Sequence, residues 1–125
     1  MAPAAGDGAA GDSERVTGRI KFPGSWLRRH GLVADDCRVL TVAGESMEPT
    51  LPEGCSILIA RHPRPRRAGR IFVVRTADGV VVKRAGKNAA GRWRLESDHP
   101  AWQPVPWPRD AEVVGEVRWA ARTFA

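Results

Sequence analysis

The sequence predicts a single, mostly β domain of short strands with one short helix near its N-terminus. Three observations predict it. The chain has 125 residues, the length of one ordinary domain, and 42% of them are hydrophobic, which is enough for one core. Its apolar residues form short segments typical of strands. Its 13 Gly and 10 Pro are spread along the chain, so turns separate these segments and a coiled coil is not expected.

The N-terminal part is predicted to contain a tail and the one helix. Residues 1–19 are mostly Ala, Gly and polar residues, and we expect a flexible tail before a domain that spans residues 20–125. Ser25 is expected to cap a helix over residues 26–30, and Gly31 is expected to end it.

The rest of the chain predicts strands joined by turns. The third and fourth strands flank Thr76-Ala77-Asp78-Gly79, a typical hairpin turn, and Gly115 is expected to form a β-bulge in the last strand. Short strands with little helix favour a compact barrel-like or sandwich arrangement. The expected strands cover residues 38–42, 56–60, 71–75, 80–84, 92–95 and 112–119.

Charge and cysteine content narrow the class of protein. Twenty Lys and Arg against 14 Asp and Glu give a net charge of +6, which permits contact with nucleic acid or acidic surfaces without showing it. The two cysteines, Cys37 and Cys55, fit neither a disulfide framework nor a metal site. We therefore expect no metal or other cofactor and a reducing, cytoplasmic location. The sequence begins with no secretory signal and has no run near the ~18 apolar residues of a membrane span, so no membrane contact is expected.

Direct binding of DNA is not expected without an added domain. A helix-turn-helix unit needs about three helices, and only one short helix is predicted before residue 38. Residues 61–70 hold five arginines, which predict either a surface for nucleic acid or an acidic partner, or a solvated loop, and the solvated loop is favoured. No aromatic residue is interleaved in this stretch, which argues against stacking of single-stranded bases there.

Two residues are candidate catalytic groups. Ser46 follows a strand and Gly44, in a turn where neighbouring backbone N–H groups, those of Glu45 and Ser46, could stabilise an oxyanion. Lys83 follows three valines, and strand alternation places it on the same face as Val81. Taken alone, each has a more ordinary interpretation: the serine as a cap or turn residue, and the lysine as an edge residue with its amine in water.

Four segments carry a combined signal: Gly44–Leu51 with Gly54, Val82–Arg84, Trp93–Pro100 and Val114–Val117. Taken in this order, they resemble the LexA/UmuD-type serine peptidases, which are relatives of the signal peptidases. The resemblance extends over about residues 20–120 and implies that Ser46 is the nucleophile and Lys83 its base. Cys55 stands where these relatives usually carry Asp, and His99 where they usually carry Asn. These departures bear on substrate geometry and turn stability rather than on the dyad.

The implied chemistry requires an uncharged lysine at neutral pH. A free lysine has a pKa of about 10.4, so holding it neutral at pH 7 costs about 4.6 kcal/mol. Burial among aliphatic side chains can lower the pKa of a lysine by the amount required, and the valines beside Lys83 are suited to bury it. A Ser-His-Asp triad finds no support in the spacing of His30, His62 and His99 from Ser46.

The resemblance also implies a substrate and partners. Such relatives cut an Ala-Gly or Cys-Gly bond some 35 residues before the nucleophile, and Ala10-Gly11 has this position, although five other Ala-Gly pairs occur. A homodimer, stimulation by a RecA filament and a place in a DNA-damage or prophage response are implied by analogy. Two alternatives stay open: a signal-peptidase-like protease acting on other chains, and a catalytically silent dimerisation module. The apolar loop 102–108 is interpreted as a core lid or as a dimer contact.

Overall fold

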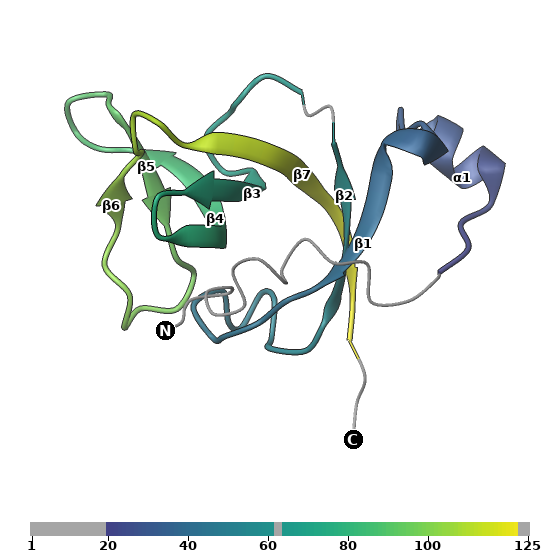
Figure 1. Cartoon of the computed structure of the whole chain (residues 1–125), viewed down its shortest axis with the longest axis horizontal. Coiled ribbons are helices and arrows are strands. Elements are labelled where there is room, and N and C mark those ends of the chain that lie inside the picture. Colours follow the sequence, from purple (N-terminus) through teal and green to yellow (C-terminus); the bar gives the residue numbers. More distant parts are fainter. Residues whose placement is uncertain (1–19, 62–63, 123–125) are drawn as a thin grey trace.

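Seven strands form one antiparallel sheet in the computed structural model, which describes residues 20–61 and 64–122 (Figure 1). The order is β1-β2-β7-β3-β4-β5-β6, so the last strand in the sequence, β7, lies between β2 and β3. The mostly β prediction is confirmed, and the strands form one curved sheet rather than two packed sheets. The strands are β1 (Cys37–Thr41), β2 (Ser56–Ala60), β3 (Ile71–Thr76), β4 (Gly79–Lys87), β5 (Trp93–Glu96), β6 (Val105–Pro106) and β7 (Glu112–Ala121).

The helix α1 (Gly24–Arg29) begins earlier than predicted. Its N-cap is Pro23, whose carbonyl accepts a hydrogen bond from the N–H of Leu27, and no side chain caps it. The predicted Ser25 cap is therefore wrong, because proline's fixed φ starts the helix before the serine and places Ser25 inside its first turn. Gly31 follows the helix with a φ of 66°, as expected for a terminating glycine. A short 3-10 helix, Ala34–Asp36, leads into β1 and was not expected.

Strand β7 joins the two halves of the sheet through two β-bulges. Its pairing to β3 shifts between Val73 and Val74 and leaves Val114 as the extra residue, next to the predicted bulge at Gly115. Its pairing to β2 shifts between Leu58 and Ile59 and leaves Arg118 as a second extra residue. Each bulge bends and twists the strand, and Figure 1 shows β7 curving from the β3–β4 side of the molecule to the β1–β2 side.

Three apolar clusters fill the domain. The central cluster includes Val80, Val82 and residues 47 and 51 of the turn that carries Ser46. A second cluster packs α1 against β1 and β2, and a third places Phe72 and Leu95 beneath Trp93 and Trp107. Among residues 20–61 and 64–122, no helix is long and apolar enough to cross a membrane. Residues 1–19, on which the tail prediction and the Ala10-Gly11 bond fall, lie outside the described residues.

Replacing Gly115 with alanine is expected to destabilise the fold. A Cβ at this position would lie 2.9 Å from the carbonyl oxygen of Ala60 and 2.9 Å from a methyl carbon of Ile59, so β2 and β7 would have to separate. We expect a loss of about 1–3 kcal/mol in the free energy of unfolding, measured by urea denaturation. Glu112→Ala on the exposed end of the same strand is the control and should change stability by less than about 1 kcal/mol. Equal losses of stability for Gly115→Ala and Glu112→Ala would contradict the close approach of Gly115 to β2.

Candidate active site

The turn that carries Ser46 is closed at its base by backbone hydrogen bonds. The N–H of Val42 donates to the carbonyl of Cys55 at 2.9 Å, and the N–H of Gly54 donates to the carbonyl of Val42 at 2.8 Å. We call residues 43–54 the serine loop. Gly44 has a φ of 84°, a conformation that favours glycine, so this residue lets the chain turn sharply two positions before the serine.

Two apolar side chains anchor the serine loop in the central core. Met47 is fully buried and Leu51 is 2% exposed, and the N–H of Leu51 donates to the carbonyl of Met47 at 2.8 Å. Ser46, immediately before Met47, is also fully buried. The serine is therefore held by a fixed turn rather than placed on a solvated loop.

Lys83 reaches the serine from the middle of β4. It pairs with Phe72 of β3 in the sheet register and is 9% exposed. Its Nζ lies 3.1 Å from Ser46 Oγ, although 37 residues separate the two in the chain. The structure thus brings together the two residues that the sequence analysis selected, in a buried contact.

A second serine also lies within hydrogen-bond distance of the amine. Lys83 Nζ lies 2.7 Å from Ser97 Oγ, closer than it lies to Ser46. Ser97 lies in the segment Trp93–Pro100 on which the resemblance partly rests, but no role was predicted for it. The signal that could have found it is register: Arg84 pairs with Glu96, so the residue after Glu96 lies beside Lys83.

An ion pair holds the turn that carries Ser97. Arg84 donates two hydrogen bonds to the carboxylate of Asp98, at 2.9 and 2.7 Å. The Arg84 guanidinium, followed by a hydrogen bond from Thr50 of the serine loop, holds the pKa of Asp98 below its ordinary value of 3.8. The next residue, His99, donates its backbone N–H to the carbonyl of Ser46 at 2.9 Å. The turn after β5 is thereby fastened both to β4 and to the serine loop.

His99 approaches Ser46 through its backbone and not through its ring. Its Nδ1 accepts a hydrogen bond from the N–H of Ala101 at 3.0 Å, and the ring packs edge-on against Trp102. These contacts stabilise the turn and do not form a Ser-His arrangement. The position at which the resemblance raised a doubt is therefore a turn residue in this protein.

Both cysteines are free thiols without an evident part in the site. Cys55 lies in the central core, where burial raises the pKa of its thiol. Burial also raises the pKa of the Cys37 thiol, with Asp36 adding to the effect. The oxyanion role of the Glu45 and Ser46 backbone N–H groups stays a prediction.

We call residues 61–70 the Arg-rich loop. Its described residues, 61 and 64–70, are mostly exposed, as predicted, but some of them have specific partners. Arg64 makes a two-point ion pair with Glu116 of β7, at 3.1 and 2.6 Å, and Glu116 is only 1% exposed. Arg70 lies 3.8 Å from the same carboxylate. A buried carboxylate needs such partners, so the interpretation as a purely solvated loop does not hold for these residues.

Comparison with known proteins gives two findings. The family model described as Peptidase S24-like matches residues 2–118. The chain is also 25% identical over 119 residues to the Repressor protein CI of Enterobacteria phage phi80. That match covers 93% of this chain and 50% of the repressor, so the chain spans about half the length of this relative.

Neutralising Asp98 is expected to weaken the fold in a pH-dependent way. Because the pKa of Asp98 is lowered in the folded state, its carboxylate stabilises the protein above about pH 4, and the contribution disappears as the pH falls below 3.8. Asp98→Asn should lower the free energy of unfolding by about 1 kcal/mol at pH 7, since the pair is partly open to water. Urea denaturation at pH 7 and pH 3 should show the difference from the unmodified protein shrinking at pH 3.

The matched control is Glu112→Gln, which breaks an exposed ion pair with Arg75. It should have little effect at either pH. A difference for Asp98→Asn that is the same at both pH values would contradict a role for the carboxylate charge.

Proposed function

The chain belongs to the Peptidase S24-like family, and on that premise we propose that it is a serine peptidase in which Lys83 activates Ser46. The observation that carries the proposal is the buried approach of Lys83 Nζ to Ser46 Oγ, at 3.1 Å. A serine hydroxyl needs a base within hydrogen-bond distance before it can attack a carbonyl. Lys83 occupies that position from a rigid strand.

The surroundings of Lys83 support its use as a base. Burial disfavours the charged form of an amine, and Lys83 lies on the face of the sheet that carries Phe72, Val81 and Ala85. A neutral amine has one lone pair and two hydrogens. The lone pair can accept the Ser46 hydroxyl proton while one N–H donates to Ser97 Oγ at 2.7 Å. Ser97 would then orient the lone pair toward the nucleophile.

The proposed reaction proceeds in two stages. Lys83 Nζ takes the proton of Ser46 Oγ as the oxygen attacks the peptide carbonyl carbon, and the N–H groups of Glu45 and Ser46 hold the oxyanion. The carbon–nitrogen bond breaks, and the Lys83 ammonium returns its proton to the departing amine. A water molecule then gives a proton to Lys83 as it attacks the ester carbonyl. The bond from the carbonyl carbon to Ser46 Oγ breaks, the acid is released, and Lys83 returns its proton to Ser46 Oγ.

The proposed substrate is the chain's own Ala10-Gly11 bond. The support is its position 35 residues before Ser46 and the composition of residues 1–19. The similarity to a phage repressor supports a role in transcription regulation with the family's expected companions, a homodimer and a RecA filament. The inference of a homodimer and of a RecA filament rests on analogy with relatives.

Loss of either dyad group is expected to abolish cleavage. The unmodified chain, incubated at pH 7 and at pH 10, should lose its first ten residues faster at pH 10, because a larger fraction of Lys83 is neutral there. Ser46→Ala and Lys83→Ala should stay intact at both pH values. Mass spectrometry of the product identifies the cut bond, and a product that does not begin at Gly11 would remove Ala10-Gly11 as the site.

Mixing experiments separate the alternatives. Intact Ser46→Ala protein mixed with a small amount of unmodified protein reports cutting of another chain. Efficient cutting of this added protein would favour a processing protease over self-cleavage. If the unmodified chain stays intact at pH 10 and cuts no added chain, the remaining alternative is a catalytically silent dimerisation module.

Ser97→Ala is expected to slow cleavage without abolishing it. The change removes the oxygen that lies 2.7 Å from the amine but leaves the Ser46–Lys83 contact. We expect the rate to fall about 10- to 100-fold, with the pH dependence displaced from that of the unmodified protein. Ser97→Thr keeps a hydroxyl and should restore most of the rate. A threonine variant as slow as the alanine variant would indicate a packing role only.

A further inference from the structure

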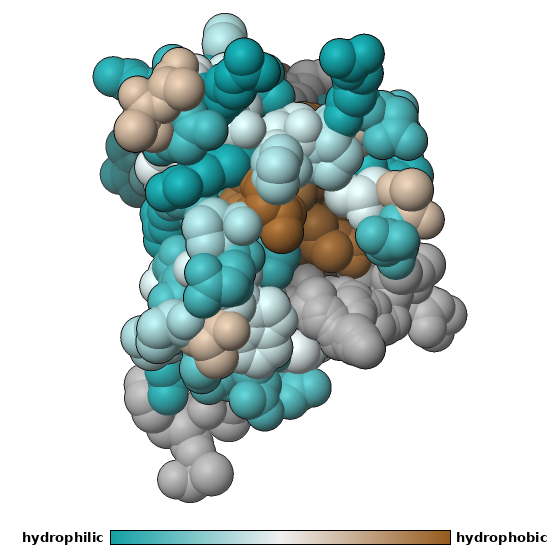
Figure 2. Space-filling model, turned by 90° about the vertical axis from the view of Figure 1, so that its left-hand side faces the viewer, coloured by the Kyte–Doolittle hydropathy of each residue, from teal (hydrophilic) through white to brown (hydrophobic). Residues whose placement is uncertain are grey.

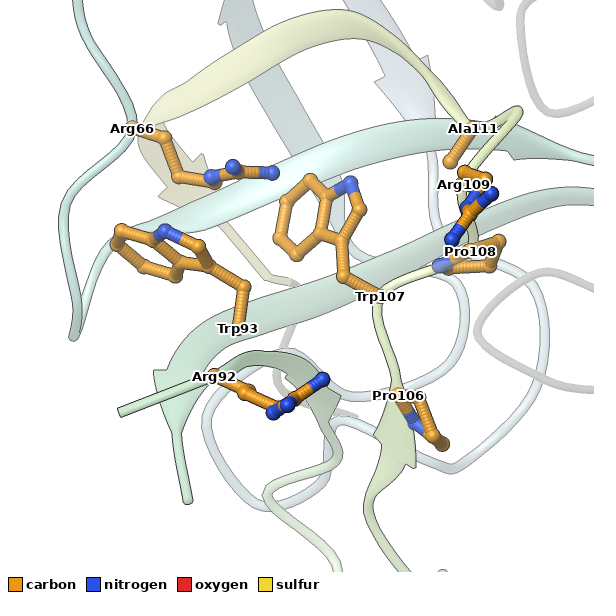
Figure 3. A pocket seen from close by; sticks show the side chains of 8 residues that line it. All are labelled: Arg66, Arg92, Trp93, Pro106, Trp107, Pro108, Arg109 and Ala111. Carbon is orange, nitrogen blue, oxygen red and sulfur yellow. The ribbon is translucent and has the colours of Figure 1, made fainter. Parts of the chain in front are cut away.

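A groove lined by arginine and tryptophan lies at the β5–β6 end of the sheet, on residues that take no part in the proposed dyad. Its volume is about 550 Å³, within the range of pockets that hold small organic ligands. Figure 3 shows the two indole rings side by side, with the three arginines around them. We call it the Arg–Trp groove, and it is formed by Arg66, Arg92, Trp93, Pro106, Trp107, Pro108, Arg109 and Ala111.

The two tryptophans hold Arg66 in place. The guanidinium carbon of Arg66 lies 4.5 Å from the ring centroid of Trp93 and 4.5 Å from that of Trp107. The two indoles contact each other edge-on, at 6.4 Å between centroids, and Lys87 Nζ lies 4.6 Å from the Trp93 ring. An arginine fixed on aromatic rings offers both N–H donors and a planar surface to a ligand.

The positive charge of this groove is not neutralised within the described part of the protein. Residues 20–61 and 64–122 place no carboxylate in an ion pair with Arg66, Arg92, Arg109 or Lys87. Figure 2 shows that the β5–β6 side of the molecule is mostly hydrophilic, with hydrophobic residues gathered in one patch near its centre. An anionic ligand therefore fits the groove better than an apolar one.

The edge of the sheet argues against a peptide added there as a further strand. Strand β6 is the outer strand, and the N–H of Trp107 points inward, donating to the carbonyl of Trp93 at 3.2 Å. Because backbone N–H groups alternate in direction along a strand, the backbone nitrogen of Pro106, the residue before Trp107, faces the outer edge. Proline has no N–H, so this edge lacks the donors that β-strand addition requires.

From this combination we propose that the Arg–Trp groove binds single-stranded nucleic acid. Arg66, Arg92 and Arg109 would contact phosphates, and unpaired bases would stack on the half-buried indoles and on the Arg66 guanidinium. The fold supplies the aromatic rings that are missing from the Arg-rich loop itself, because Trp93 and Trp107 come from distant segments. Duplex nucleic acid keeps its bases paired and cannot stack in this way.

The test is fluorescence anisotropy of labelled oligonucleotides of about ten nucleotides, with the full chain at several salt concentrations. The unmodified protein should bind oligothymidylate or oligouridylate more tightly than a duplex of equal length, and comparing these two shows whether DNA or RNA is preferred. Trp107→Ala should weaken binding about 5- to 100-fold. Arg66→Ala should weaken binding and reduce the slope of log affinity against log salt by about 0.7.

Matched controls keep the proposal falsifiable if Trp107→Ala disturbs packing against Phe72. Arg66→Ala and Arg92→Ala change exposed residues and should leave the circular dichroism spectrum unchanged. Arg67→Ala in the same loop and Trp102→Ala outside the groove should bind like the unmodified protein. The proposal is overturned by no binding at low salt, by equal affinity for the duplex or for an oligoglutamate peptide, or by equal losses for Arg66→Ala and Arg67→Ala.

Discussion

The structure depends on one buried contact, between the amine of Lys83 and the hydroxyl of Ser46, 3.1 Å apart. Two independent devices hold it. Met47 and Leu51 anchor the serine loop in the core, and the pairing of β4 with β3 fixes the lysine. Burial makes the charged form of an amine more costly, so in the proposed mechanism the burial that stabilises the domain would also favour a neutral Lys83. Under that proposal the same packing would serve both folding and catalysis.

Strand β7 connects this site to the other features of the molecule. Its two bulges let it pair with β2 on one side and β3 on the other, and its buried Glu116 draws Arg64 against the sheet. Two residues further along the loop, Arg66 lies over Trp93 and Trp107. The Arg-rich loop is therefore fixed at one point by a carboxylate and at another by aromatic rings. This arrangement leaves the groove open to an external anion.

Features set by local sequence pattern or by the family resemblance could be predicted from the sequence. Contacts between segments that are distant in the sequence could not. Alternation along β4 correctly assigns Lys83 and Val81 to one face, and the motif order selects Ser46 and Lys83 before any distance is known. Ser97 was missed because its place beside the amine follows from the register of β4 and β5. Strand β6 was missed because it has only two residues, one of which is a proline, and the contact of Arg66 with two indoles joins three separate segments. The prediction of a Ser25 cap was wrong because the helix begins after Pro23, before Ser25 is reached.

The charge state of the Lys83 amine shows most directly whether this residue can act as a base toward Ser46. It can be followed by NMR titration of the side-chain nitrogen in the Ser46→Ala protein, which cannot cut itself by the proposed route. If Lys83 is the base, this amine should lose its proton at a pH clearly below the value of about 10.4 found for free lysine. An amine that stays charged up to that value could not serve as the base at neutral pH, and the proposed dyad would be ruled out.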